Sequence, residues 1–238
     1  MDTVKFKNSG VKVIAHRGLS GIEAENTVSS FVAAANRTYW GIETDVHVTG
    51  DGAYVLIHDD TTERVCKEKL VVEKSSYQEL SGLFVYDRFG NTRSDRTIPR
   101  LEDFLQVCSV YKKHPVIEFK NPFEPKNIKE VLGIVKNFGL LSEAVFISFS
   151  KENMINLRKL NKVVKAQLLT SEFEPELITF LKKYGLGIDI SVAALTESVA
   201  SKLKKFGIEI NCWTCDLPEN AERLCALGID YITTNILE

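Results

Sequence analysis

The chain has 238 residues, of which 44% are hydrophobic and 26% are charged, a balance typical of a globular protein with a sizeable core. Its 30 lysines and arginines are offset by 32 aspartates and glutamates. Because nucleic-acid-binding proteins usually carry a basic face, this balance counts against a nucleic-acid partner.

Short strand-like runs alternate with helix-like segments along the chain. A strand is predicted at 11–15, a helix begins at Asn26-Thr27 and continues to Tyr39-Trp40, and two strands follow at 41–47 and 54–58. The later helices are predicted at 101–111, 128–138, 152–160, 175–184, 198–206 and 218–227. The later strands are predicted at 115–119, 144–149, 164–169, 186–190, 208–214 and 231–234.

These segments make about eight strand–helix units when 41–58 is counted as one arm with an extra hairpin. Eight such units close a TIM (β/α)8 barrel, which is the α/β fold that we expect. A doubly wound open sheet would show the same alternation. However, the chain lacks the glycine-rich or Walker-type loop typical of nucleotide-binding sheets.

Residues 60–98 interrupt the alternation with a polar stretch that contains Thr61-Thr62-Glu63-Arg64 and Tyr86-Asp87-Arg88. Long excursions inside a compact domain are often functional, so we expect a small insertion after the second strand that overhangs the site. The whole chain, 1–238, fits a single barrel domain, since such barrels commonly run to roughly 200–250 residues.

The cellular compartment is suggested by what the sequence lacks. No apolar run is long enough to cross a bilayer, so we expect no stable membrane insertion. Residues 1–6 lack the pattern of a signal peptide, which favours a cytoplasmic protein over a secreted one whose signal has been removed.

The five cysteines are scattered, and Cys212 and Cys215 of the C-x-x-C run lie in a predicted strand, where they point to opposite faces. Buried thiols are therefore favoured over a redox pair.

Polar, titratable residues lie at the ends of the first three hydrophobic runs: His16-Arg17 after 11–15, Glu43-Thr44-Asp45 after 41–42 and His58-Asp59 after 54–57. Parallel barrels place their chemistry at the carboxyl ends of the strands. Two histidines can act as base and acid near neutral pH, and an arginine suits a phosphate or carboxylate group. Asp59 could hold His58 in one tautomer or cap the following turn.

Glu43 and Asp45 are two residues apart on a strand, so their side chains share a face. Two such carboxylates repel each other unless a cation or donors compensate, and a salt-bridged pair at a barrel mouth is the alternative. Glu118 ends another apolar run, with Lys120 on the same face. Three carboxylates without a thiol favour Mg²⁺ or Ca²⁺, which predicts metal-assisted cleavage at phosphorus.

Two further histidines are weaker candidates. His47 shares the face of Glu43 and Asp45 but lies past the expected strand end, where it could join them. His114 precedes Pro115 at the amino-terminal end of its strand, so a structural or solvated role is expected.

Several motifs together carry a resemblance to a known family. They are Ile14–Gly18, Glu25-Asn26-Thr27, Glu43–Val46 with Thr49–Gly52, Val55–Asp59, Ile98–Glu102, Ile117–Lys120, Ile147-Ser148-Phe149 and Trp213-Thr214. In order and spacing the chain resembles the glycerophosphodiester phosphodiesterase family. The resemblance implies a TIM barrel with an insertion after the second strand.

The resemblance also implies roles for individual residues. The acid/base pair would be His16 and His58, the metal ligands Glu43, Asp45 and Glu118, the phosphate-contacting cations Arg17 and Lys120, and an aromatic group near the pocket mouth Trp213. A buried aromatic on the seventh strand is an equal alternative for Trp213. Arg100 and Asn235 depart from the family pattern, which usually has Thr and Asp there, and Asn235 could alter the pocket rim.

The activity implied is hydrolysis of a small glycerophosphodiester to glycerol 3-phosphate and an alcohol such as choline, ethanolamine or inositol. A lysophospholipase D-type or sphingomyelinase D-type enzyme acting on lipids is one alternative, and it would need an apolar channel. A barrel without turnover that binds phosphoesters is the other, although such a module has no need of both histidines.

Overall fold

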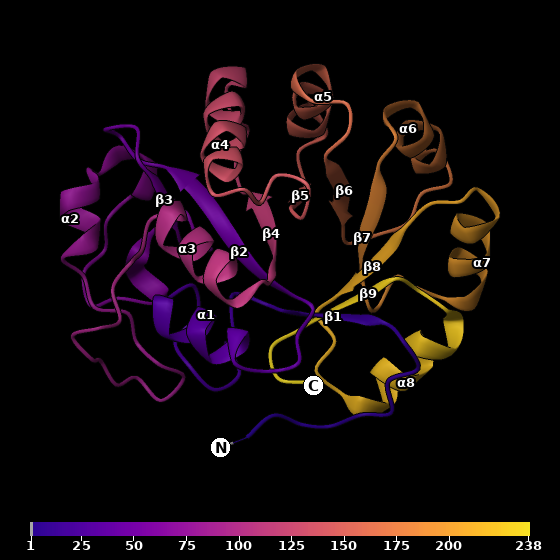
Figure 1. Ribbon diagram of the computed structural model, residues 1–238, viewed down its shortest axis with the longest axis horizontal. Helices are drawn as coiled ribbons and strands as arrows, with labels where there is room; N and C mark the ends of the chain where they lie inside the picture. Colours follow the sequence, from indigo (N-terminus) through magenta and orange to yellow (C-terminus); the bar gives the residue numbers. More distant parts are fainter. Residues whose placement is uncertain (1) are drawn as a thin grey trace.

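The alternating segments wind into a barrel of parallel strands with helices on the outside (Figure 1). The computed structural model describes residues 2–238. β1 (Lys12–Ala15) pairs in parallel both with β2 (Gly41–Val48) and with β9 (Tyr231–Thr234), which closes the ring. The expected TIM barrel is therefore confirmed, and the open-sheet alternative is wrong.

Eight strands form the ring, in the order β1, β2, β4 to β9. The other barrel strands are β4 (His114–Phe119), β5 (Val145–Ser148), β6 (Lys165–Thr170), β7 (Gly187–Ser191) and β8 (Ile210–Trp213). β3 (Tyr54–Leu56) pairs antiparallel with β2 alone, as expected for an extra hairpin. It is shorter than the predicted 54–58, although the Ile57 backbone N–H still donates to the Asp45 carbonyl at 3.2 Å.

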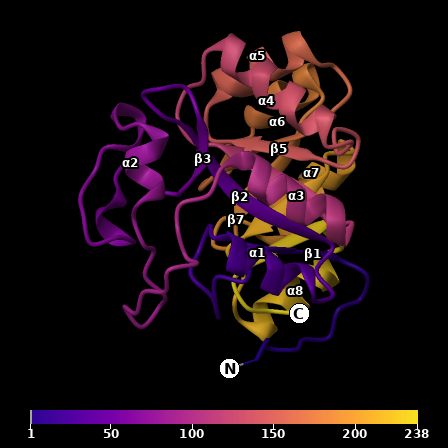
Figure 2. The same ribbon diagram turned by 60° about the vertical axis from the view of Figure 1, so that its left-hand side comes forward.

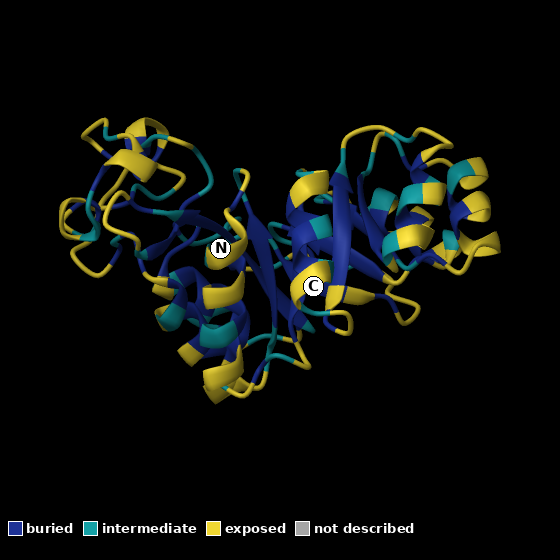
Figure 3. Cartoon of the chain, turned by 90° about the horizontal axis from the view of Figure 1, so that it is seen from above, coloured by how far each residue is buried: buried dark blue, intermediate teal, exposed yellow. Residues whose placement is uncertain are grey.

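The helices cover the outer surface of the ring, and their outward faces are exposed while the strands are buried (Figure 3). They are α1 (Val28–Ala35), α3 (Leu101–Tyr111), α4 (Pro125–Asn137), α5 (Lys151–Leu160), α6 (Leu177–Tyr184), α7 (Glu197–Lys205) and α8 (Pro218–Leu227). Within residues 2–238, no helix has both the length and the apolar character that crossing a bilayer requires.

The largest differences from the predicted helix boundaries are at the end of α1 and the start of α4. α1 ends at Ala35 rather than near Trp40, because the Trp40 backbone N–H donates to the Val13 carbonyl (2.9 Å) and draws the chain back to the barrel. α4 begins at Pro125, three residues earlier than expected, since proline suits the first turn of a helix.

Alternation along each strand separates two kinds of core. Outward-facing residues such as Ile188 and Ile190 of β7 pack against the helices. The inward-facing apolar residues form a smaller cluster of Ile14, Val116, Val145, Ile147, Leu169 and Tyr231. The inward positions that follow along β1, β2 and β4 are polar, which places the functional groups at the carboxyl end of the ring.

Residues 60–98 lie to one side of the barrel, beyond β3 (Figure 2). They contain α2 (Tyr77–Ser81) and the single-turn helices η1 (Thr62–Arg64) and η2 (Val72–Lys74). Their own apolar cluster joins Val72, Leu80 and Ile98 to Val55 and Ile57 of the β3 arm. The segment is therefore packed on the arm that carries His58.

Candidate active site

A cavity of about 160 Å³ opens at the carboxyl end of the strands. Its lining joins most of the predicted site residues to apolar groups: His16, Arg17, Glu43, His58, Glu118, Ile147, Phe149, Leu169, Asp189, Trp213, Thr214 and Thr233. Residues more than 200 positions apart thus meet in one hollow, because the strand ends of a closed barrel converge there.

Three carboxylates gather at one wall of this cavity. Glu43 and Asp45 share the inner face of β2, and Asp45 is in register with Glu118 of β4. Each offers an oxygen, and these oxygens lie within 4.8 Å of one another. All three side chains are buried, with Glu43 only 2% exposed.

Burial and mutual repulsion set the protonation of these carboxylates. Burial, with the charge of Asp45, raises the pKa of Glu118 to about 8 and that of Glu43 well above its ordinary value. Burial opposes ionisation of Asp45 too, but Lys120 and Arg17 keep its pKa below the usual value. The Oε1 atom of Glu43 has no hydrogen-bond partner among the described residues. A divalent cation would relieve this repulsion, and an all-carboxylate set fits Mg²⁺ or Ca²⁺.

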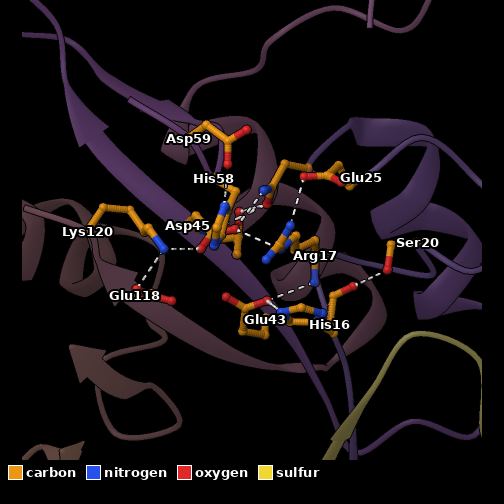
Figure 4. Close-up of polar contacts among 12 residues, drawn as sticks. His16, Arg17, Ser20, Glu25, Glu43, Asp45, His58, Asp59, Glu118 and Lys120 are labelled. Carbon is orange, nitrogen blue, oxygen red and sulfur yellow. Dashed lines mark hydrogen bonds and ion pairs between the residues drawn. The ribbon is translucent and has the colours of Figure 1, made fainter. Parts of the chain in front are cut away.

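Arg17 and Lys120 lie on either side of Asp45 (Figure 4). Lys120 Nζ lies 3.3 Å from Asp45 Oδ1 and 2.9 Å from Glu118 Oε1. Arg17 Nε lies 3.4 Å from Asp45 Oδ2, and the Arg17 backbone N–H donates to Glu43 Oε2 at 2.8 Å. Both predicted phosphate-contacting cations therefore border the predicted metal ligands.

His16 follows β1 directly and is oriented by residues from the last two strand ends. Its Nδ1 lies 2.8 Å from Asn235 Oδ1, and the Asn235 side-chain amide donates to Asp216 Oδ2 at 2.6 Å. Because that oxygen is an acceptor, Nδ1 carries the proton and Nε2 keeps its lone pair, 4.0 Å from Glu43 Oε2. Burial, reinforced by Arg17, lowers the pKa of His16 to about 4, so its ring is neutral at neutral pH.

His58 is held on the opposite side by a carboxylate. Its Nδ1 lies 2.6 Å from Asp59 Oδ1, and Arg64 Nε lies 2.6 Å from the other oxygen of Asp59. Arg64 also reaches Glu25, which in turn pairs with Arg17 at 3.0 Å. Of the two roles considered for Asp59, the contact supports the tautomer-holding one. Burial lowers the pKa of His58, with the charge of Asp45 acting against it.

The two weaker histidine candidates lie outside the cavity. His47 is fully buried in β2, and its ring nitrogens lie near Glu73 Oε1 (3.2 Å) and the His58 carbonyl (3.4 Å). It therefore joins the insertion to the His58 arm and does not join the carboxylates. His114 stacks on Trp40 at the other end of the barrel, which agrees with its expected structural role.

Two other sequence features also prove remote from the chemistry. Arg100 lies at the start of α3 with its guanidinium 4.1 Å from the Tyr77 ring centroid, away from the cavity. Cys212 and Cys215 are buried free thiols, and burial raises the pKa of Cys215 to about 11. Unreactive buried thiols are what the strand placement predicts.

Trp213 lines the cavity and is partly buried, so the pocket-mouth role is compatible with its position. Phe149 packs against it edge to face at 5.6 Å and is 45% exposed. Sequence reasoning did not select Phe149, Asp189 or Asp216 as site residues. The alternation of β7 would have flagged Asp189, a charged residue between two isoleucines on an inward-facing position.

Comparisons with known proteins agree with this geometry. The profile of the Glycerophosphoryl diester phosphodiesterase family matches residues 16–238. The chain is 27% identical to a glycerophosphodiester phosphodiesterase of Caldanaerobacter subterraneus, with 94% of this chain and 93% of that protein covered. One of Bacillus altitudinis is 28% identical, with 94% of both chains covered.

Solved structures share the fold. The glycerophosphodiester phosphodiesterase of Thermotoga maritima has a TM-score of 0.79 at 26% identity, with 96% of both chains covered. An Oleispira antarctica phosphodiesterase, solved in complex with the product sn-glycerol-3-phosphate, has a TM-score of 0.85 at 24% identity. That comparison covers 94% of this chain and 92% of the other.

Proposed function

Because the chain belongs to the glycerophosphoryl diester phosphodiesterase family, we propose that it hydrolyses glycerophosphodiesters to glycerol 3-phosphate and an alcohol, using a divalent cation and two histidines. The observation that carries the proposal is the meeting of His16, His58 and three buried carboxylates at one barrel mouth. The product bound to the Oleispira antarctica protein supports a small-molecule substrate.

Glu43, Asp45 and Glu118 would hold the cation. When bound, Mg²⁺ or Ca²⁺ would neutralise charge that develops on the phosphoryl oxygens. Arg17 and Lys120 border the same carboxylates and would share that charge with donors fixed in place before the reaction. This role would account for the burial of two positively charged side chains beside three carboxylates.

The two histidines would divide the proton transfers. His16 is neutral, with its Nε2 lone pair free to take a proton from the attacking hydroxyl or water. Burial lowers the pKa of His58, but the Asp59 carboxylate favours its protonated ring against that effect, so His58 would be the group that protonates the leaving alkoxide. Each transfer is worth roughly 10²–10⁴-fold in rate.

The test is release of glycerol 3-phosphate from glycerophosphocholine, glycerophosphoethanolamine and glycerophosphoinositol. We expect no release in EDTA and restored release after Mg²⁺ or Ca²⁺ is added. His114→Gln, a histidine change outside the cavity, is the matched control and should keep wild-type activity. Failure to release product with either cation would contradict the proposal.

A lysolipid substrate is the second candidate, on a specific observation. Phe149 is half exposed at the cavity rim beside Trp213, which offers an apolar surface to an acyl chain. Lysophosphatidylcholine therefore belongs in the same assay. Turnover of it without turnover of glycerophosphocholine would favour the lipid-directed activity.

A further inference from the structure

The cavity contains one carboxyl group that the proposed chemistry does not use. Asp189 lies at the centre of β7, is 1% exposed, and lines the cavity that His16, His58 and Glu118 also line. Its Oδ1 atom has no hydrogen-bond partner within residues 2–238. Buried polar atoms are almost always hydrogen-bonded, so an unpartnered one on a residue that lines a cavity is a candidate for binding a ligand there.

The strand alternation explains why Asp189 faces inward. Ile188 and Ile190, on either side of it, pack in the outer core between strands and helices. Asp189 is in register with Leu169 of β6 and Asn211 of β8. The strand therefore places a carboxyl group among inward-facing side chains, with no freedom to reach solvent.

The neighbours of Asp189 do not satisfy it. The Asn211 side chain donates to Gln167 and accepts from the Thr233 hydroxyl, so both its nitrogen and its oxygen have other partners. Trp213 Nε1 donates to the Asp189 backbone carbonyl at 3.1 Å, which fixes the main chain and leaves the carboxyl group untouched. The Oδ1 atom of this carboxyl group thus has no protein partner of its own among the described residues.

Asp189 is also separate from the predicted metal ligands. The three clustered carboxylates come from β2 and β4, and Asp189 is not one of the group whose oxygens lie within 4.8 Å of each other. β5 and β6 separate its strand from β4 around the ring. The lining of the cavity also includes the apolar side chains of Ile147, Leu169 and Trp213, and Leu169 is in register with Asp189.

Such surroundings favour the neutral form of a carboxyl group. Burial, reinforced by the charge of Glu118, raises the pKa of Asp189 well above its ordinary value. A neutral carboxyl group has one O–H donor and a carbonyl acceptor, the same pair of functions that an alcohol can satisfy. A neutral carboxyl group would therefore bind a hydroxyl group of the substrate more favourably than a charged group.

We propose that Asp189 binds substrate by hydrogen-bonding the terminal hydroxyl of the glycerol moiety, and so selects phosphodiesters that carry this hydroxyl. The inference rests on the proposed function and adds a specificity-determining residue to it. A site built to hydrogen-bond a hydroxyl discriminates strongly against an analogue that lacks it, because the buried group is then left unpaired.

The experiment compares two substrates across three enzymes. The substrates are glycerophosphocholine and its analogue built on propane-1,2-diol, which lacks only the terminal hydroxyl. The enzymes are wild type, Asp189→Val and Asp189→Asn, with Ile190→Val, on the outward face of β7, as the matched control. Near-ultraviolet circular dichroism and thermal unfolding check the fold of each variant.

We expect wild type to prefer glycerophosphocholine by roughly 10²-fold in kcat/KM. Asp189→Val should lose most of this preference, because its activity on glycerophosphocholine falls while its activity on the analogue stays within a few-fold of wild type. Asp189→Asn retains a donor and an acceptor and should keep most of the preference. Equal losses on both substrates, or an unchanged preference in Asp189→Val, would overturn the inference.

Two binding measurements separate this inference from its premise. Calorimetry should show the same Mg²⁺ or Ca²⁺ affinity in wild type and Asp189→Val, and a large loss would instead place Asp189 in the metal site and overturn the proposal. Calorimetry with glycerol 3-phosphate should show weaker binding to Asp189→Val without any need for turnover. If wild type neither hydrolyses these substrates nor binds the cation or glycerol 3-phosphate, the proposed function itself fails.

Discussion

The two histidines of the site are held by different parts of the molecule. His16 is oriented by Asn235 and Asp216, which follow β9 and β8, so its surroundings belong to the barrel ring. His58 is oriented by Asp59 and by Arg64 of the 60–98 segment, outside the ring. The His16 side chain is 17% exposed and that of His58 is 34% exposed.

The two histidines therefore have the same side chain but different hydrogen-bond partners, which suits them to different roles in proton transfer. An amide oxygen accepts from His16 and adds no charge, whereas a carboxylate favours the protonated form of His58. The orientation of His16 depends on the register of the barrel strands. The orientation of His58 depends on how the 60–98 insertion packs against the barrel. Substitutions near His16 and near His58 should therefore have different effects on activity.

Removal of either histidine should abolish most of the activity. We expect His16→Ala and His58→Ala to lower kcat by roughly 10²–10⁴-fold, because each loses one proton transfer. Steady-state kinetics with glycerophosphocholine measures the loss, and His114→Ala is the control outside the cavity. A variant at 16 or 58 that retained near wild-type turnover would remove that histidine from the mechanism.

Exchanging the amide of Asn235 and the carboxylate of Asp216 should give His16 a carboxylate partner, as His58 has. Asn235→Asp alone places a carboxylate against Asp216, where the present contact is 2.6 Å, and should lower kcat by roughly 10–100-fold. Combining it with Asp216→Asn restores a donor–acceptor pair and should recover much of the loss. Nitrogen-15 spectra of the histidine rings should show the Nδ1–H tautomer of His16 in wild type. No recovery in the double variant would contradict the orienting role.

The acid stability of the cation-free protein should report on His16. Its folded-state pKa of about 4 lies below the ordinary 6.5, so unfolding takes up a proton between these values and stability falls as pH drops from 6.5 to 4. His16→Gln should remove up to about 3 kcal/mol of this fall in unfolding free energy. Urea unfolding in EDTA at both ends of the range measures it. An identical pH dependence in wild type and variant would contradict the low pKa.

Loss of the link to the insertion should have the smallest effect. Arg64→Ala removes the ion pairs to Asp59 and Glu25, which are partly exposed, and should lower kcat/KM by about 3- to 10-fold. Salt should lower wild-type activity toward that of the variant, because exposed pairs are screened. Arg93→Ala, an insertion arginine paired with Asp95, should behave as wild type. Equal effects of Arg64→Ala and Arg93→Ala on kcat/KM would show that the insertion does not orient His58 through Arg64.

Local pattern was enough to predict much of the fold and site. Period-two alternation places Glu43 and Asp45 on one face, and repeated strand–helix units predict the barrel that the structure confirms. His16, His58 and Glu118, to which the resemblance assigns roles in one site, line the same cavity. Helix ends were predicted less well, because the end of α1 depends on a return to β1 that lies outside the helix itself.

Local sequence alternation is enough to show which residues share a face of their own strand. Which of these faces meet across the ring depends on how the strands are assembled into the barrel. Asn235 orients His16 from 219 positions away, and Asp189 lines the cavity with an Oδ1 atom that has no hydrogen-bond partner within residues 2–238. The physical reason is barrel closure: pairing of β1 with both β2 and β9 sets the register between distant strands, and no local pattern encodes that register.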